Sequence, residues 1–199
     1  MQLAFLWALQ ANTIPATFWV LFLAIRDPRA RAALTAEVRS VLDAAPKDEA
    51  GRPQLTRAVL TSLVTLDSAI NEALRMTSGS LTIREALEDV TLTLHDGRSL
   101  RIRQGERVGI YPYLMHHDPA LYDEPGTYRF DRYLDGSGAL KKTFLRNGVR
   151  IRTHLMPFGG GVSMCPGRHF ARNEIKIAAA MLLHGFDVDI PQDLSLIHI

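Results

Sequence analysis

Residues 157–168 read Pro-Phe-Gly-Gly-Gly-Val-Ser-Met-Cys-Pro-Gly-Arg, and this stretch decides the fold of the 199-residue chain. Three consecutive glycines permit positive φ angles and a close approach of the backbone to a ligand. We expect Cys165 to lie at the start of a helix, because Pro166 suits a first helical turn. The N–H groups and dipole of a helix N-terminus stabilise a thiolate, which is a good ligand for a soft metal ion. A lone cysteine is more often an inert core thiol, so its surroundings decide between the two.

Helical patterns dominate the N-terminal part of the chain. Residues 1–26 are mostly apolar and predict a long central helix that ends before Asp27-Pro28. Polar residues interrupt this segment and no basic region precedes it, so we expect a buried helix and not a signal peptide or a membrane span. Further helices are predicted at residues 29–43, around Leu55, at 66–76, and at 167–184 with Gly185 as the stop.

A β pattern begins near residue 90. Apolar and polar residues alternate on both sides of Asp96-Gly97, which predicts a β-hairpin over residues 90–102. Another short strand is expected at 108–110, and residues 117–138 predict a long irregular segment, which is uncommon unless it is functional. Helices first, hairpins between and a closing helix together indicate a mostly α, α+β fold.

The composition excludes several classes of protein. The chain is 47% hydrophobic and 22% charged, as expected of a globular domain and not of a disordered one. A net charge of +2 is too small to indicate binding to nucleic acid. The single cysteine allows no intrachain disulfide and fits a reducing compartment.

The spacing Phe158-x-x-Gly161-x-x-x-Cys165-x-Gly167 resembles the signature of the cytochromes P-450. The resemblance implies that Cys165 is the axial ligand of a haem iron and that Phe158 packs beside its sulfur. It also implies that the glycines let the loop lie against the porphyrin. Many members have Arg or His two residues before the cysteine, where it meets a haem propionate. Ser163 stands there in this chain, so other residues must pair with the propionate.

A second motif, Glu72-Ala73-Leu74-Arg75, resembles the Glu-x-x-Arg helix of the same family. The i, i+3 spacing places both charges on one face of a helix, where they can pair. The resemblance implies that Arg132 completes a buried Glu–Arg–Arg cluster, whereas the residues alone would also fit an ordinary surface pair. Arg84 lies where the family commonly places a propionate-binding arginine. The pair His116-His117 could ligate a metal, but the family has similar residues there without one.

The first helix departs from the family pattern. Members usually have an acid followed by threonine where they assist proton delivery to bound oxygen, and here Ala11 and Asn12 occupy those positions, followed by Thr13. Pro15 cannot donate to the Ala11 carbonyl and is expected to kink the helix there. The freed carbonyl and the Asn12 amide would offer hydrogen bonds to oxygen or water. The alternative is a kinked core helix with a polar patch.

The stretch from Gln10 to Pro15 resembles the sterol and oxysterol 7α-hydroxylase branch of the family. Prostacyclin synthases and sterol 12α-hydroxylases share the asparagine. The resemblance implies a haem-thiolate monooxygenase that hydroxylates a sterol or related lipid with O2. Alternatives are a haem-thiolate lipid isomerase of the prostacyclin-synthase type, an inactive truncated fragment, and a cysteine-nucleophile hydrolase. No typical base motif lies near Cys165 to support the last of these.

The resemblance also implies partners. Electrons would come from a flavoprotein reductase fed by NADPH, which is expected to dock near Arg168, Arg172 and Lys176. A basic run could extend this surface or could be a solvated loop; it comprises Lys141, Lys142, Arg146, Arg150 and Arg152.

The resemblance covers residues 1–193, which we expect to be an incomplete C-terminal part of a P-450 domain. The upstream part would contain a membrane anchor, which implies the endoplasmic reticulum membrane for the parent protein. Residues 194–199 depart from the family and are expected to be a non-native tail.

Overall fold

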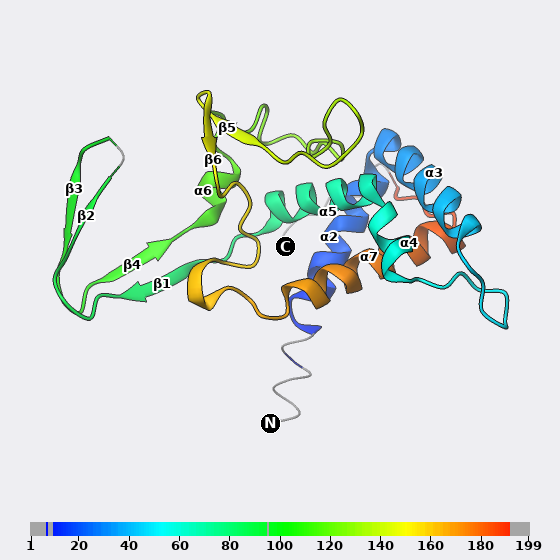
Figure 1. Cartoon of the computed structure of the whole chain (residues 1–199), viewed down its shortest axis with the longest axis horizontal. Helices are drawn as coiled ribbons and strands as arrows, with labels where there is room; N and C mark the ends of the chain where they lie inside the picture. The colour runs from blue at the N-terminus through cyan, green and yellow to red at the C-terminus, as the bar shows by residue number, and fades with distance from the viewer. Residues whose placement is uncertain (1–6, 8–9, 95, 192–199) are drawn as a thin grey trace.

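The computed structural model describes residues 7, 10–94 and 96–191 (Figure 1). The main helices are α2 (Thr13–Arg26), α3 (Pro28–Ala44), α4 (Arg57–Ser62), α5 (Val64–Thr77) and α7 (Arg168–Gly185). Three two-stranded antiparallel sheets and the short helix α6 (Pro112–His116) lie between α5 and α7 in the sequence. The mostly α, α+β fold class is therefore confirmed. The expected tail at 194–199 lies outside the described residues.

The helices α2, α3, α5 and α7 pack around one apolar core (Figure 1). Helix α3 shows how the sequence builds it, because Ala30, Leu34, Val38 and Leu42 recur every four residues and are fully buried. Such a stripe lies on one face of a helix and excludes water from the seam with its neighbours. None of the helices in the described ranges is both long and apolar enough to cross a membrane.

The boundary between α2 and α3 was predicted at Asp27-Pro28 and is confirmed. The Asp27 side chain accepts hydrogen bonds from the N–H groups of Arg29 and Ala30 at 2.8 and 3.3 Å. Pro28 occupies the first helical position, where a missing N–H costs nothing. One residue pair thus ends α2 and caps α3.

The first helix is interrupted where the kink was expected. Residues 7 and 10 are helical, residues 11–12 form a turn, and α2 begins at Thr13. Pro15 is the third residue of α2 and has no N–H for the Ala11 carbonyl. Residues 1–6 and 8–9 of the predicted long helix lie outside the described residues.

The predicted hairpin is present as β2 (Val90–Thr93) and β3 (Ser99–Ile102), with Val90 opposite Ile102. Gly97 takes φ +84° at its turn, a conformation that favours glycine. The hairpin is carried by β1 (Thr82–Glu85) and β4 (Arg107–Ile110), which pair with each other (Figure 1). The strand expected at 108–110 is therefore confirmed, whereas β1 was not predicted.

Residues 117–143 contain no helix or strand, as expected for the irregular segment. Tyr122 and Tyr133 of this segment pack with Phe144 and form a second small core. A third hairpin follows, formed by β5 (Phe144–Arg146) and β6 (Val149–Ile151). Sequence reasoning missed this hairpin, although its turn residues Asn147 and Gly148 both have positive φ and are a typical hairpin signal.

Candidate functional site

The glycine-rich loop presents Cys165 to solvent as a free thiol. Gly159 and Gly161 take φ values of +73° and +65°, which L-residues rarely adopt. A Cβ on Gly160 would lie 2.6 Å from Cε of Met156, so a side chain there would force the methionine to move. The Cys165 N–H donates to the Phe158 carbonyl at 3.0 Å and closes the loop. Phe158 itself packs against the helical core, which ties the loop to the body of the protein.

The expected position of Cys165 at the start of a helix is wrong. Helix α7 begins at Arg168, and a turn formed by Pro166 and Gly167 separates it from the cysteine. Pro166 keeps Cys165 itself out of the helical conformation, because a residue that precedes proline is sterically disfavoured there. The Cys165 carbonyl accepts instead from the Arg168 backbone N–H at 3.4 Å and from its Nη1 at 3.1 Å.

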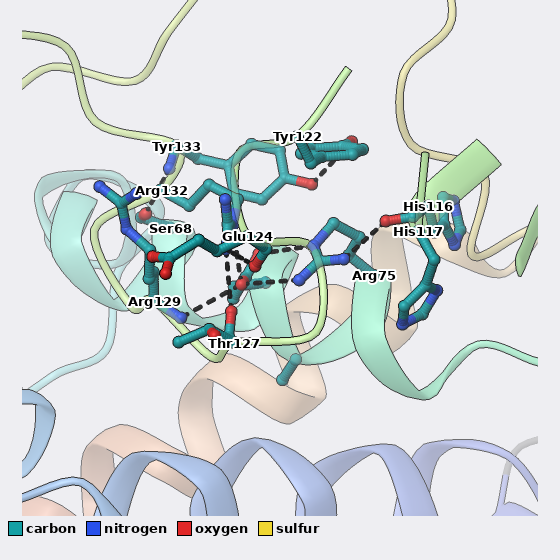
Figure 2. A network of polar contacts seen from close by, with 12 residues as sticks. Ser68, Arg75, His116, His117, Tyr122, Glu124, Thr127, Arg129, Arg132 and Tyr133 are labelled. Carbon is teal, nitrogen blue, oxygen red and sulfur yellow. Dashed lines mark hydrogen bonds and ion pairs between the residues drawn. The ribbon is translucent and has the colours of Figure 1, made fainter. Parts of the chain in front are cut away.

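Glu72 on α5 lies at the centre of a buried charge cluster, and Figure 2 labels its partners Arg75, Arg129 and Arg132. Its carboxylate accepts from Nε and Nη2 of Arg75 at 2.8 and 2.9 Å. Arg132 donates from Nε to the same carboxylate at 2.8 Å, and the Arg129 backbone N–H adds a bond at 3.1 Å. The side chains of Glu72 and Arg75 have no exposed area, so they are not a surface pair. The structure thus brings Glu72, Arg75 and Arg132 together.

The remaining donors of Arg132 hold the irregular segment, whereas Nη1 of Arg75 donates to the His116 carbonyl in α6. Arg132 donates to the carbonyls of Asp123, Glu124 and Thr127, all within residues 117–143 (Figure 2). The Tyr122 ring lies 5.0 Å from the Arg75 guanidinium and 6.0 Å from that of Arg132. Burial raises the pKa of Tyr122 to about 12, so its hydroxyl keeps its proton and donates to the His154 carbonyl at 2.6 Å.

The sequence model of the cytochrome P450 family matches residues 2–197. The chain belongs to the cytochrome P450 family.

The names of relatives within this family state the sterol they act on or the product they make. Cholesterol 7-alpha-monooxygenase of Cricetulus griseus is 47% identical over 95% of this chain and 38% of its own length. The 25-hydroxycholesterol 7-alpha-hydroxylase of Rattus norvegicus is 41% identical over 95% of this chain and 46% of its own. Prostacyclin synthase of Bos taurus is 36% identical over 96% of this chain and 40% of its own. The P450 chain described here therefore spans less than half the length of these relatives.

Membership of the cytochrome P450 family implies haem, and the residues around Cys165 fit that group. The thiol is exposed, and on the same loop Val162 is fully exposed and Met164 is partly exposed. An accessible sulfur beside apolar side chains and bare glycine backbone suits a flat apolar macrocycle with a thiolate-ligated iron. Among the atoms of the protein itself, a Cβ on Gly167 would lie 3.8 Å from the Cys165 sulfur, an ordinary contact.

Arg84 lies on the strand that borders the P450 cysteine loop. Thr82 Oγ1 is 4.0 Å from the position of a Cβ on Gly159, so the start of β1 lies beside the glycines. Residues two apart on a strand share a face, which places Arg84 on the same side as Thr82. Its side chain is exposed and, among the described residues, donates one hydrogen bond, from Nη1 to the carbonyl of Ile83. Arg84 is therefore available to an anionic group.

Ala11, Asn12 and Thr13 lie at the interrupted start of α2. Asn12 is exposed and its side chain makes no capping hydrogen bond. The Asn12 carbonyl continues the helix by accepting from Ala16 N–H at 3.1 Å, and the Thr13 carbonyl accepts from Thr17 Oγ1 at 2.8 Å. The amide of Asn12 is thus the polar group that this turn offers to a ligand.

Lys176 was predicted to dock a redox partner, and that prediction is wrong. Its ammonium group is buried between α4 and α5, where Nζ donates to Asp67 at 2.6 Å and to the Leu60 carbonyl at 2.5 Å. Arg172 is half-buried, with Nη2 3.9 Å from the same aspartate. The alternation of charge and apolar residues along α7 does not reveal that one lysine points inward to a carboxylate on another helix.

Proposed function

We propose that the full-length protein is a haem-thiolate monooxygenase that hydroxylates a sterol or oxysterol. The observation that carries this proposal is the exposed Cys165 thiol on a glycine loop, closed by the bond from Cys165 N–H to Phe158, in a cytochrome P450 chain. The sterol substrate is supported by the 47% and 41% identity to relatives named as sterol 7α-hydroxylating enzymes.

Each site residue has a distinct part in this proposal. Cys165 would hold the haem iron, and Gly159 to Gly161 would allow the porphyrin to lie against the backbone. Arg84 would neutralise a propionate, in place of the basic residue that Ser163 does not supply. When bound, the haem supplies the activation of dioxygen. The Asn12 amide and the Ala11 carbonyl would hold a water molecule and pass its proton toward the oxygen side of the site.

Electrons in this scheme come from NADPH through a flavoprotein reductase. Two members of the basic run are already engaged, since Lys141 donates to the Arg132 carbonyl and Arg146 pairs with Asp118. The other three make no ion pair within the described part of the chain and line a cavity of about 550 Å³; they are Lys142, Arg150 and Arg152. A concentration of unpaired positive charge attracts an acidic partner, so we place reductase docking on these three residues.

We also propose that the protein works at the endoplasmic reticulum membrane, held by an anchor in its upstream sequence. The greater length of the relatives and the apolar character of a sterol substrate support this. Fractionation of cells that express the full-length protein should recover it with microsomes, and recovery in the soluble fraction would contradict the proposal.

The decisive experiment uses the full-length protein, purified and reduced in the presence of carbon monoxide. We expect the absorption band of a thiolate-ligated haem, and hydroxylation of cholesterol or 25-hydroxycholesterol when reductase and NADPH are added. Cys165→Ser should abolish the band and the product together. A normal thiolate band in Cys165→Ser would refute the assignment of the iron ligand.

A second candidate function is rearrangement of a lipid peroxide without a reductase. It is favoured by Ala11 and Asn12, which replace the usual acid and threonine, and by the 36% identity to a prostacyclin synthase. Turnover with the reductase omitted separates the two candidates. Product formed from a lipid peroxide without NADPH, together with no oxidation of sterols, would establish the isomerase.

A further inference from the structure

His116 connects two parts of the molecule that lie far apart in the sequence. It is the last residue of α6 and is fully buried. Its backbone carbonyl accepts from Arg75 Nη1 at 2.6 Å, which joins it to the Glu72 cluster (Figure 2). Its side chain reaches the other way, and Nε2 accepts from the Met156 backbone N–H at 2.9 Å.

Met156 forms the base of the glycine loop. Its carbonyl accepts from the Gly159 N–H at 3.3 Å, and its methyl group fills the space beside Gly160. Two residues later, the Phe158 carbonyl accepts the N–H of Cys165. The bond from Met156 to His116 thus fixes the first residue of the hydrogen-bonded loop that positions Cys165.

The His116 imidazole is neutral, because a protonated ring would present an N–H to the Met156 N–H. Burial, followed by the positive charge of Arg75, lowers the pKa of His116 to about 4; His117 and His154 add smaller effects in the same direction. Nε2 therefore accepts throughout the neutral range, and the proton resides on Nδ1. Nδ1 has no hydrogen-bond partner among the described residues. The bond to Met156 is therefore the hydrogen bond that the His116 ring makes within the described part of the chain.

We infer that the His116 side chain is a positioning residue for the cysteine loop, linking the Glu72–Arg75–Arg132 cluster to Met156. The inference rests on the proposed haem-thiolate function. It can be separated from a general structural role because the bond to Arg75 uses the backbone carbonyl, which every substitution retains. Only the bond to Met156 depends on the side chain.

The test compares two amides in the full-length protein. His116→Gln keeps an acceptor at about the reach of Nε2, whereas His116→Asn has the same chemistry but is one methylene shorter and cannot reach Met156. His117→Asn is the matched control, since His117 is partly exposed, stacks on the Tyr113 ring and, among the described residues, has its hydrogen bond to the Tyr113 carbonyl at 3.1 Å and none to the cysteine loop. The readouts are the haem-thiolate band of the reduced carbon-monoxide complex, and hydrogen exchange of residues 155–165 and of α5.

We expect His116→Asn to speed exchange in residues 155–165 by roughly tenfold, because a buried N–H loses its acceptor. It should also lower the intensity of the haem-thiolate band in the reduced carbon-monoxide complex. The exchange of amide protons in α5 should stay unchanged. His116→Gln and His117→Asn should resemble the wild type, whereas failure to recover folded His116→Asn would show a general structural role and count against the inference. Equal behaviour of the Asn and Gln variants, or accelerated exchange in α5, would overturn the inference. Absence of the band from the wild type would refute the proposed function, and the exchange comparison would still test His116.

Discussion

Replacing Glu72 with glutamine tests whether the buried cluster stabilises the protein as a charged unit. The substitution preserves the shape of the side chain and removes its charge. Both ion pairs of the cluster use this carboxylate, with Arg75 and Arg132 each 2.8 Å from it. In Glu72→Gln, two buried guanidinium groups would lose their counter-charge, and an amide N–H₂ would face N–H donors.

The magnitude follows from the burial of these groups. Removing one partner from a buried ion pair costs about 3–5 kcal/mol, since the remaining charge is left without compensation. The Gln carbonyl can still accept one of the bonds, so we expect a loss near the lower limit, about 3 kcal/mol. That loss corresponds to a more than hundredfold change in the unfolding equilibrium.

The assay is urea unfolding of the full-length protein, with Glu85→Gln as the matched control. Glu85 pairs with Arg107 at 3.2 Å, but 52% and 73% of these side chains are exposed. An exposed pair of this kind contributes less than about 1 kcal/mol. If Glu72→Gln costs no more than Glu85→Gln, the arginines must be compensated by other groups, and the account of the cluster as a charge unit fails.

Four further predictions address other parts of the molecule. Cys165→Ser should change the free energy of unfolding by less than about 1 kcal/mol because the thiol is exposed, yet abolish the thiolate band; a large loss of stability would show that the thiol has a structural role. Lys176→Glu should lower the free energy of unfolding by about 3 kcal/mol or more, since it places a carboxylate against Asp67. Arg150→Glu should slow reduction of the haem by the reductase in stopped-flow measurements and leave stability unchanged. Because the pKa of His116 is lowered in the folded state to about 4, its contribution to stability is present above about pH 6.5. That contribution is lost as the pH falls toward 4, by up to about 3 kcal/mol, and urea titrations at pH 7 and 4.5 should show a smaller decrease for His116→Gln than for the wild type.

Features governed by neighbouring residues could be predicted from the sequence. The helix boundary at Asp27-Pro28 depends on a cap and a proline, and the hairpin over residues 90–102 depends on alternation around a turn. The facing of Glu72 and Arg75 depends on helical spacing alone. Features governed by distant contacts could not be predicted in this way. Lys176 is buried because Asp67, more than a hundred residues earlier, lies within reach of its ammonium group.

The cysteine loop shows the same division within a single motif. Local reasoning placed Cys165 at the start of α7 and assigned its stabilisation to the helix N-terminus, but the helix begins at Arg168, after a turn formed by Pro166 and Gly167. The position of the thiol is set instead by the bond to Phe158 and, one step further back, by the bond from Met156 to His116. His116 in turn is joined to Arg75, and so the cysteine loop depends on the Glu72 cluster through one buried histidine. The two motifs that carry the family resemblance are therefore parts of one hydrogen-bonded structure, because α6 connects them and not because they are near in sequence.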